Sequence, residues 1–225
     1  SANTTASSNT AVGSAALLAN TTGASNTSVG QGSLESNTTG TRHVAVGALA
    51  LDANTTGSHN VALGYAALGA NTTASYNIAI GDSAMGNNTT GTNNIAIGQD
   101  ALSANTTTNR NVAIGIEAMK VSTGSENTAL GYQSLKANTT GNRNVAVGDA
   151  ALQVNTTADD NTAIGQGALQ ATTTGIQNTA VGRTALNANT TANENTAVGY
   201  RALVVSTTAT RNTAVGGDAL QACTT

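Results

Sequence analysis

The fold is decided by stretches such as residues 144–165, NVAVGDAALQVNTTADDNTAIG, in which the pentapeptide Asn-x-Ala-(Val/Ile/Leu)-Gly occurs twice, 17 residues apart. The pentapeptide recurs 13 times along the 225-residue chain, with Ser28 replacing Ala once and His43 replacing Asn once. A fixed period of this length is typical of solenoids, in which each repeat is one coil packed on the next. The sequence therefore predicts a single continuous array of about 13 coils over residues 1–225, without caps. Because the array begins and ends partway through a repeat, we expect a segment of a longer fibre or a filament subunit.

The composition argues against several classes of protein. Charged residues make up 8% of the chain and the net charge is −3, so nothing favours nucleic-acid binding. No apolar run approaches the ~20 residues that span a bilayer, which argues against membrane insertion. The single cysteine, Cys223, cannot form an internal disulfide and stands where most coils have Asn, so we interpret it as a drifted repeat position.

We number each coil from position 1, the Asn of the pentapeptide, to position 17. Alternation and β-branched residues at positions 2 and 4 predict a first short strand, as in residues 77–81, with Ile78 and Ile80 facing inward. A second short strand is predicted around Leu102 and Ala104. The fold class is therefore all-β, a parallel β-solenoid or β-roll with two short strands per coil. The predicted core ladder contains Ile80, Leu102, Ile114, Leu135, Leu152 and Leu169.

Charges and length changes agree with this coil. All Asp, Glu, Lys and Arg residues fall at positions 6, 7, 10, 16 or 17, which we assign to turns or outward sites. The one shortened repeat, with an interval from Gly115 to Gly131, lacks a residue near Val121–Gly124, also in a predicted turn.

Positions 1, 3 and 5 remain Asn, Ala and Gly while other positions vary, and on this scheme they face outward. We therefore predict a flat self-association face made of Ala79, Gly81, Ala96, Gly98, Ala113, Gly115, Ala146 and Gly148. The alternative is a very narrow coil in which the strand turns its Ala inward.

Catalytic chemistry finds little support. His43 and His59 lie on neighbouring coils, and Asp82 with Asp100 and Asp159 with Asp160 lie in turns, where solvated charge is the simplest interpretation. We predict no enzyme activity, no catalytic or cofactor-binding residue, no metal site and no cofactor. The recurrent Asn-Thr-Thr is formally a glycosylation acceptor, but a turn with stacked hydrogen-bonded ladders is favoured.

The segments Asn77–Gly81, Asn111–Gly115 and Asn161–Gly165 resemble the coil motif of YadA-like heads in trimeric autotransporter adhesins. The longer phrase over residues 178–191 also resembles repeats of phage tail-fibre proteins. This resemblance covers essentially the whole chain. It implies a left-handed β-roll, three chains side by side, and a fibre that meets a cell surface.

We therefore expect a structural protein that forms the shaft of an extracellular or virion fibre. Its expected partners are copies of itself, as a lateral homo-oligomer such as a homotrimer or as an end-to-end filament, and a cell-surface glycan or receptor. A self-polymerising filament subunit is the first alternative function, and an ice-binding solenoid is the second.

Overall fold

The computed structural model describes residues 5–222, which fall into two compact units, Ser1–Asn111 and Val112–Thr225. These are called the N-terminal unit and the C-terminal unit. The described residues contain no helix, and every strand has three residues. The N-terminal unit contains β1 (Thr10–Val12), β2 (Thr27–Val29), β3 (Val44–Val46), β4 (Val61–Leu63), β5 (Ile78–Ile80) and β6 (Ile95–Ile97). The C-terminal unit contains β7 (Val112–Ile114), β8 (Thr128–Leu130), β9 (Val145–Val147), β10 (Thr162–Ile164), β11 (Thr179–Val181), β12 (Thr196–Val198) and β13 (Thr213–Val215).

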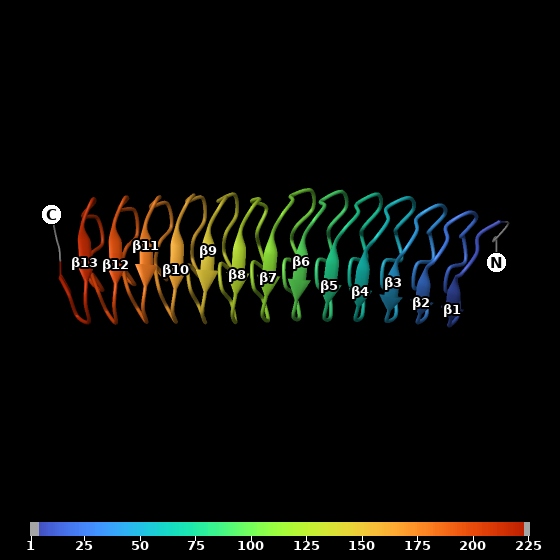
Figure 1. Cartoon of the computed structure of the whole chain (residues 1–225), viewed down its shortest axis with the longest axis horizontal. Helices are drawn as coiled ribbons and strands as arrows, with labels where there is room; N and C mark the ends of the chain where they lie inside the picture. Colours follow the sequence, from blue (N-terminus) through green and yellow to red (C-terminus); the bar gives the residue numbers. More distant parts are fainter. Residues whose placement is uncertain (1–4, 223–225) are drawn as a thin grey trace. The chain divides into compact units, whose positions relative to one another are not determined.

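Within each unit the strands pair in chain order and run parallel (Figure 1). Their register places equal coil positions opposite one another, so that Ile78 faces Ile95 and Val145 faces Thr162. The predicted parallel β-solenoid with a 17-residue repeat is therefore confirmed.

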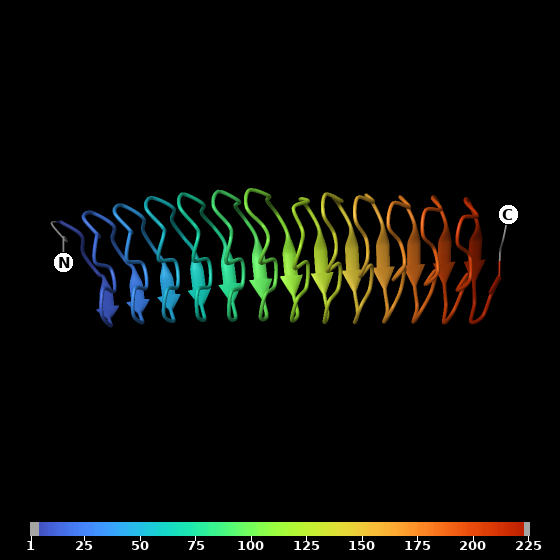
Figure 2. The same cartoon turned by 180° about the vertical axis from the view of Figure 1, so that it is seen from behind.

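Each coil has one strand, and the prediction of a second strand is wrong. Figure 2 shows a single arrow per coil, with the remainder drawn as loop. Around Leu102 the chain forms consecutive turns, in which the N–H of Ser103 donates to the carbonyl of Asp100 (3.3 Å). Asp100 and Leu102 have φ values of 56° and 53°, in the left-handed region. Left-handed residues break the alternation of a strand, so the adjacent Ala101 and Leu102 are both fully buried.

The strand also faces the opposite way from the prediction. Ala79, Ala96, Ala113 and Ala146 are 0% exposed, whereas Ile80 is 36% exposed. The predicted self-association face is therefore wrong, since these alanines line the interior of the coil. Its glycines, Gly81, Gly98, Gly115 and Gly148, are half-buried. Ile80 and Ile114 do not belong to the core, while Leu102, Leu135, Leu152 and Leu169 are fully buried.

Coil-on-coil stacking explains why Ala and Gly stay constant at positions 3 and 5. Gly148 has a φ of +130°, and a Cβ added to it would lie 2.6 Å from the carbonyl carbon of Gly165 in the next coil. A side chain there would push the coils apart, and the conformation itself favours glycine. The narrow interior leaves room for Ala at position 3, so the alternative of an inward Ala is the one that the structure shows.

The turns agree with the prediction. None of the Asp, Glu, Lys or Arg residues, all of which lie within residues 5–222, is buried. In the shortened coil, Thr123 donates its N–H to the carbonyl of Thr139 (2.8 Å), as position 13 does in other coils. Gly124 is buried like the position-15 residue elsewhere. The missing residue therefore corresponds to position 14, which is exposed in other coils, for example at Thr140.

Candidate functional site: the aliphatic face and the asparagine ladders

The outward side of the strands is largely apolar, with Val, Ile or Leu at coil position 4 and Thr, Val or Ile at coil position 2. The residues at these two coil positions point away from the core, and we call them the aliphatic face. In the N-terminal unit it contains Thr10, Val12, Thr27, Val29, Val44, Val46, Val61, Leu63, Ile78, Ile80, Ile95 and Ile97. In the C-terminal unit it contains Val112, Ile114, Thr128, Leu130, Val145, Val147, Thr162, Ile164, Thr179, Val181, Thr196, Val198, Thr213 and Val215.

The face is open to solvent and carries no charge. Val46 is 38% exposed, Leu130 44% and Ile164 40%. No charged residue occurs in β1–β13. Adjacent parallel strands are about 4.8 Å apart, so each unit presents two regular rows of methyl groups. Such contiguous apolar patches are uncommon on monomeric proteins and mark interaction surfaces.

Tyrosines border the aliphatic face. Tyr65, Tyr132 and Tyr200 occupy position 6, just after the strand, and are 56%, 51% and 48% exposed. Tyr76 occupies position 17, just before the position-1 residue, and is 59% exposed. Tyrosine combines an apolar ring with a polar tip and is enriched at interfaces that are partly wet. The border therefore has the composition of an interface rim.

Charges beside the face are paired within the chain. Arg143 donates from Nε to Oδ1 of Asp160 (2.7 Å), and Arg211 donates from Nε to Oε2 of Glu194 (3.0 Å). The Arg143 guanidinium holds the pKa of the Asp160 carboxyl below its ordinary value. These pairs are exposed and contribute little to stability. A copy that docks on the face therefore meets two ion pairs at its border whose charges are already balanced within the chain.

Two ladders of buried asparagine hold the coils together from inside. The first uses position 12. In the N-terminal unit it runs through Asn20, Asn37, Asn54, Asn71, Asn88 and Asn105, with successive Nδ2 to Oδ1 distances of 2.8–3.1 Å. These side chains are 0–2% exposed. Buried amides are tolerated only when they are hydrogen-bonded, and here each coil supplies the partner of the next.

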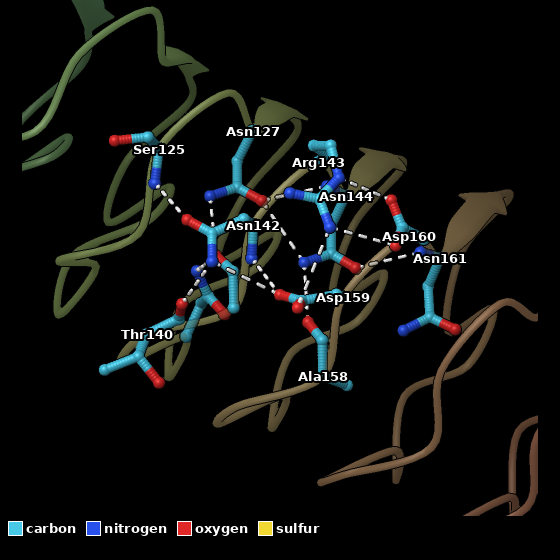
Figure 3. Close-up of polar contacts among 12 residues, drawn as sticks. Ser125, Asn127, Thr140, Asn142, Arg143, Asn144, Ala158, Asp159, Asp160 and Asn161 are labelled. Atoms are coloured by element: carbon cyan, nitrogen blue, oxygen red, sulfur yellow. Dashed lines mark hydrogen bonds and ion pairs between the residues drawn. The ribbon is translucent and has the colours of Figure 1, made fainter.

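The second ladder is formed by the position-1 residues. Here the backbone N–H of one residue donates to the side-chain oxygen of the position-1 Asn in the preceding coil, instead of to a backbone carbonyl. The N–H of Asn144 donates to Oδ1 of Asn127 (2.9 Å), and the N–H of Asn161 donates to Oδ1 of Asn144 (3.0 Å), as Figure 3 shows. The side-chain amide of Asn144 also donates to the carbonyl of Ala158 (2.8 Å). One Asn side chain therefore satisfies a backbone carbonyl near the end of its own coil and the first backbone N–H of the following coil.

His43 takes the place of Asn in this second ladder. Its N–H donates to Oδ1 of Asn26 (3.0 Å), as an Asn in this position does. The Nδ1 atom accepts from the N–H of Asn60 (3.3 Å), and Nε2 lies 2.7 Å from the carbonyl oxygen of Gly57. The side chain is 1% exposed, and burial lowers the pKa of His43 to about 4. The ring is therefore a neutral substitute for an asparagine amide.

The other histidine does not join His43 in a site. Both ring nitrogens of His43 already bond the backbone, whereas His59 contacts Arg42 through Nε2 (3.0 Å) and stacks on Tyr76 with ring centroids 4.8 Å apart. Among residues 5–222 there is no group of three or more His, Cys, Asp and Glu side chains that could hold a metal ion.

The acidic pairs have structural partners. Asp82 accepts from the hydroxyl of Ser83 (2.8 Å). Asp159 accepts from the N–H of Asn142 (2.6 Å), as Figure 3 shows, and Asp160 pairs with Arg143. Cys223 lies outside the described residues. The asparagines of the Asn-Thr-Thr turns that the structure describes are buried in the position-12 ladder, which agrees with a role in stacking.

Sequence reasoning missed the aliphatic face, although a signal for it was present. Position 2 is Thr in several coils, for example at Thr162, Thr179 and Thr196, and Val or Ile in others. Variation between the hydroxyl-bearing Thr and the wholly aliphatic Val or Ile among the coils is typical of a surface position. Positions 1 and 3 hardly change, which is typical of buried positions.

No protein-family model matches the chain, and comparisons with curated proteins and with solved structures returned no match. The part of the chain that the structure describes has no helix suited to crossing a membrane.

Proposed function

We propose that this chain is a structural protein that forms the shaft of an extracellular or virion fibre by side-by-side association of solenoids. The observation that carries the proposal is the inverted strand, which buries Ala and leaves Val, Ile and Leu outside. The narrow coil has no room for these larger apolar side chains, so only another surface packed against them can remove them from water. The aliphatic face therefore replaces the Ala and Gly face as the proposed contact between copies.

The energetics favour burial of this face. Removing apolar surface from water stabilises an association by roughly 25 cal/mol per Å². Each coil adds about two partly exposed side chains, and the contribution is repeated along the stack. No charged side chain in the strands needs to be desolvated, so the usual electrostatic penalty is absent.

A second copy of the chain is the occupant that fits best. Both copies carry methyl rows with the same spacing of about 4.8 Å, so the side chains of one can pack between those of the other along the whole contact. An unrelated globular partner would match this period only locally. Three-residue strands make a narrow ridge, which suits several copies around a common axis.

The experiment compares two double variants, each with its two substitutions in adjacent coils of the N-terminal unit. I78K/I95K places charge on the aliphatic face, and T73K/T90K places the same charge on exposed turns. Analytical ultracentrifugation is expected to show oligomers for the wild type and for T73K/T90K, and monomers with an unchanged circular dichroism spectrum for I78K/I95K. A monomeric wild type at about 100 µM, or an oligomeric I78K/I95K, would refute the proposed interface.

Electron microscopy of the purified protein distinguishes the two modes of assembly. Discrete bundles support the lateral shaft, and indefinite filaments support end-to-end polymerisation. If the chain also attaches to a cell-surface glycan or receptor, the purified protein should bind cells in a cell-binding assay. A protein that does not bind cells would have a purely structural role in the shaft.

Ice binding is a second candidate, favoured by the threonine turns. Positions 13 and 14 lie in a turn and both reach the surface, as Thr72 and Thr73 do, so adjacent threonines form two parallel rows. The hydroxyl at position 13 is held by the next coil, for example from Thr72 to the carbonyl of Thr89 (3.2 Å). This function predicts thermal hysteresis that T73K/T90K lowers and I78K/I95K retains, and absence of hysteresis in the wild type would exclude it.

A further inference from the structure

We propose that His43 makes the coils on either side of β3 an acid-sensitive segment of the solenoid, which loosens when its imidazole accepts a proton. The proposal is independent of how copies associate. It rests on the place of His43 in the asparagine ladder, where no proton acceptor remains free.

The two ring nitrogens have opposite roles. Nδ1 faces the N–H of Asn60, which can only donate, so Nδ1 must be unprotonated. Nε2 lies 2.7 Å from the carbonyl oxygen of Gly57, which can only accept, so Nε2 must carry the hydrogen. The amide of Asn54 is 3.2 Å from Nε2, but its two hydrogens are directed to the carbonyl of Gly57 and to Oδ1 of Asn37. The backbone of its own coil, through Gly57, and that of the next coil, through Asn60, thus select one neutral tautomer.

Protonation turns the contact with Asn60 into a repulsive one. An imidazolium has N–H groups at both nitrogens, so a donor at Nδ1 would face the N–H of Asn60. At 1% exposure, no water replaces the lost acceptor without movement of the coils. The strands β3 and β4 begin directly after His43 and Asn60, so this movement would separate the two coils at the start of their strands.

The surroundings offer nothing that would stabilise a positive ring. Asn54 donates to the same carbonyl of Gly57 (3.2 Å), and Asn26 accepts from the backbone of His43. The basic neighbours are Arg42, adjacent in the chain, and His59, which occupies position 17 of the same coil. The nearest carboxylates along the stack, Glu35 in the preceding coil and Asp52 in the same coil as His43, stand at position 10 in a different turn.

The direction of the pH effect follows from the pKa. The pKa of His43 is about 4 while the coils are stacked, which we call the closed state, against an ordinary value of 6.5. Between these two pH values the imidazole binds a proton when the coils have separated, which we call the opened state, and stays neutral in the closed state. Closure is therefore fully favoured above pH 6.5 and weakens as the pH falls from 6.5 toward 4. At pH 5 the opening equilibrium is expected to rise about 30-fold relative to a chain without this histidine.

The test is amide hydrogen exchange of the full chain at pH 7 and pH 5. The H43N variant restores the repeat residue and keeps the ladder, and H59N removes the other histidine as a control. Protection of the amides of residues 43–61 in the wild type is expected to fall about 20-fold relative to H43N between pH 7 and pH 5. H59N is expected to follow the wild type.

A second measurement does not depend on opening. Nitrogen chemical shifts of the His43 ring should report the tautomer with hydrogen on Nε2 at pH 5 and a titration midpoint below pH 5. Equal pH profiles for wild type and H43N, or a ring that titrates near its ordinary value, would overturn the proposal.

Discussion

The substitution of Leu152 by Ile tests why position 9 contains only Leu and Met. Leu152 is fully buried and has a φ of 50°. The position-9 residues of all coils have φ values between 47° and 54°. A branch at Cβ clashes with the backbone in this left-handed region, so Ile and Val are excluded although they are equally apolar.

The magnitude follows from two terms. Exchange of Leu for Ile in a core that can repack costs less than about 1.5 kcal/mol. Leu and Met already bear the ordinary cost of a left-handed conformation, and the second branch at Cβ of Ile adds further strain of about 1–2 kcal/mol. Exchange of Leu for Met carries only the first term, and Met85 and Met119 already occupy this position with φ values of 49°. L152I is therefore expected to be about 1–2 kcal/mol less stable than L152M.

Urea unfolding followed by circular dichroism measures this difference as a change in the free energy of unfolding. Because repeat proteins can depart from two-state unfolding, the slope must be equal in both variants before the energies are compared. The reverse exchange, I164L on the exposed side of β10, controls for a general preference for Leu and should change stability by less than about 0.5 kcal/mol. Equal stability of L152I and L152M would refute the conformational argument.

Three further changes test the stacking of the coils. G148A is expected to lower the free energy of unfolding by more than about 3 kcal/mol, because its Cβ would overlap the backbone of the next coil, and a melting temperature close to that of the wild type would contradict this. N54A removes the centre of the position-12 ladder and leaves a donor and an acceptor without partners, so urea unfolding should show a loss of about 2–4 kcal/mol, whereas a loss below about 0.5 kcal/mol would show that the ladder does not hold the coils. T172N should instead stabilise the chain, because Oδ1 of Asn155 is buried without a partner where the next coil has Thr172. Thermal unfolding is expected to show a gain of about 1 kcal/mol in the free energy of unfolding, and a loss would contradict the ladder geometry.

The buried polar ladders also explain how so thin a core is held in register. The coils from Leu17 to Leu203 each bury one Leu or Met at position 9, and most also bury small Ala side chains, which gives limited apolar area. The Asn side chains at positions 1 and 12 add hydrogen bonds that connect a coil only to its immediate neighbours. An unpaired buried amide is costly, so a slip of one residue in register would be penalised in every coil.

The repeat itself was determined by the sequence. Its period required one coil per 17 residues, because only stacking in register lets every copy make the same contacts. The sequence also placed the turns, since charges at positions such as those of Arg143 and Asp160 cannot enter a dry core. The burial of Leu at position 9 followed from the same reasoning.

The tertiary structure decided which side of the strand faces inward. In a strand that alternates Ala with Ile, hydrophobicity favours Ile inside, and that prediction failed at Ile80 and Ile114. The deciding quantity is the width of the coil, which depends on the left-handed turn around Leu102. Leucine has no intrinsic preference for a positive φ, so the local sequence around position 9 does not predict the left-handed turn. Once the turn narrows the coil, only Ala fits inside, and the larger aliphatic side chains must lie on the surface.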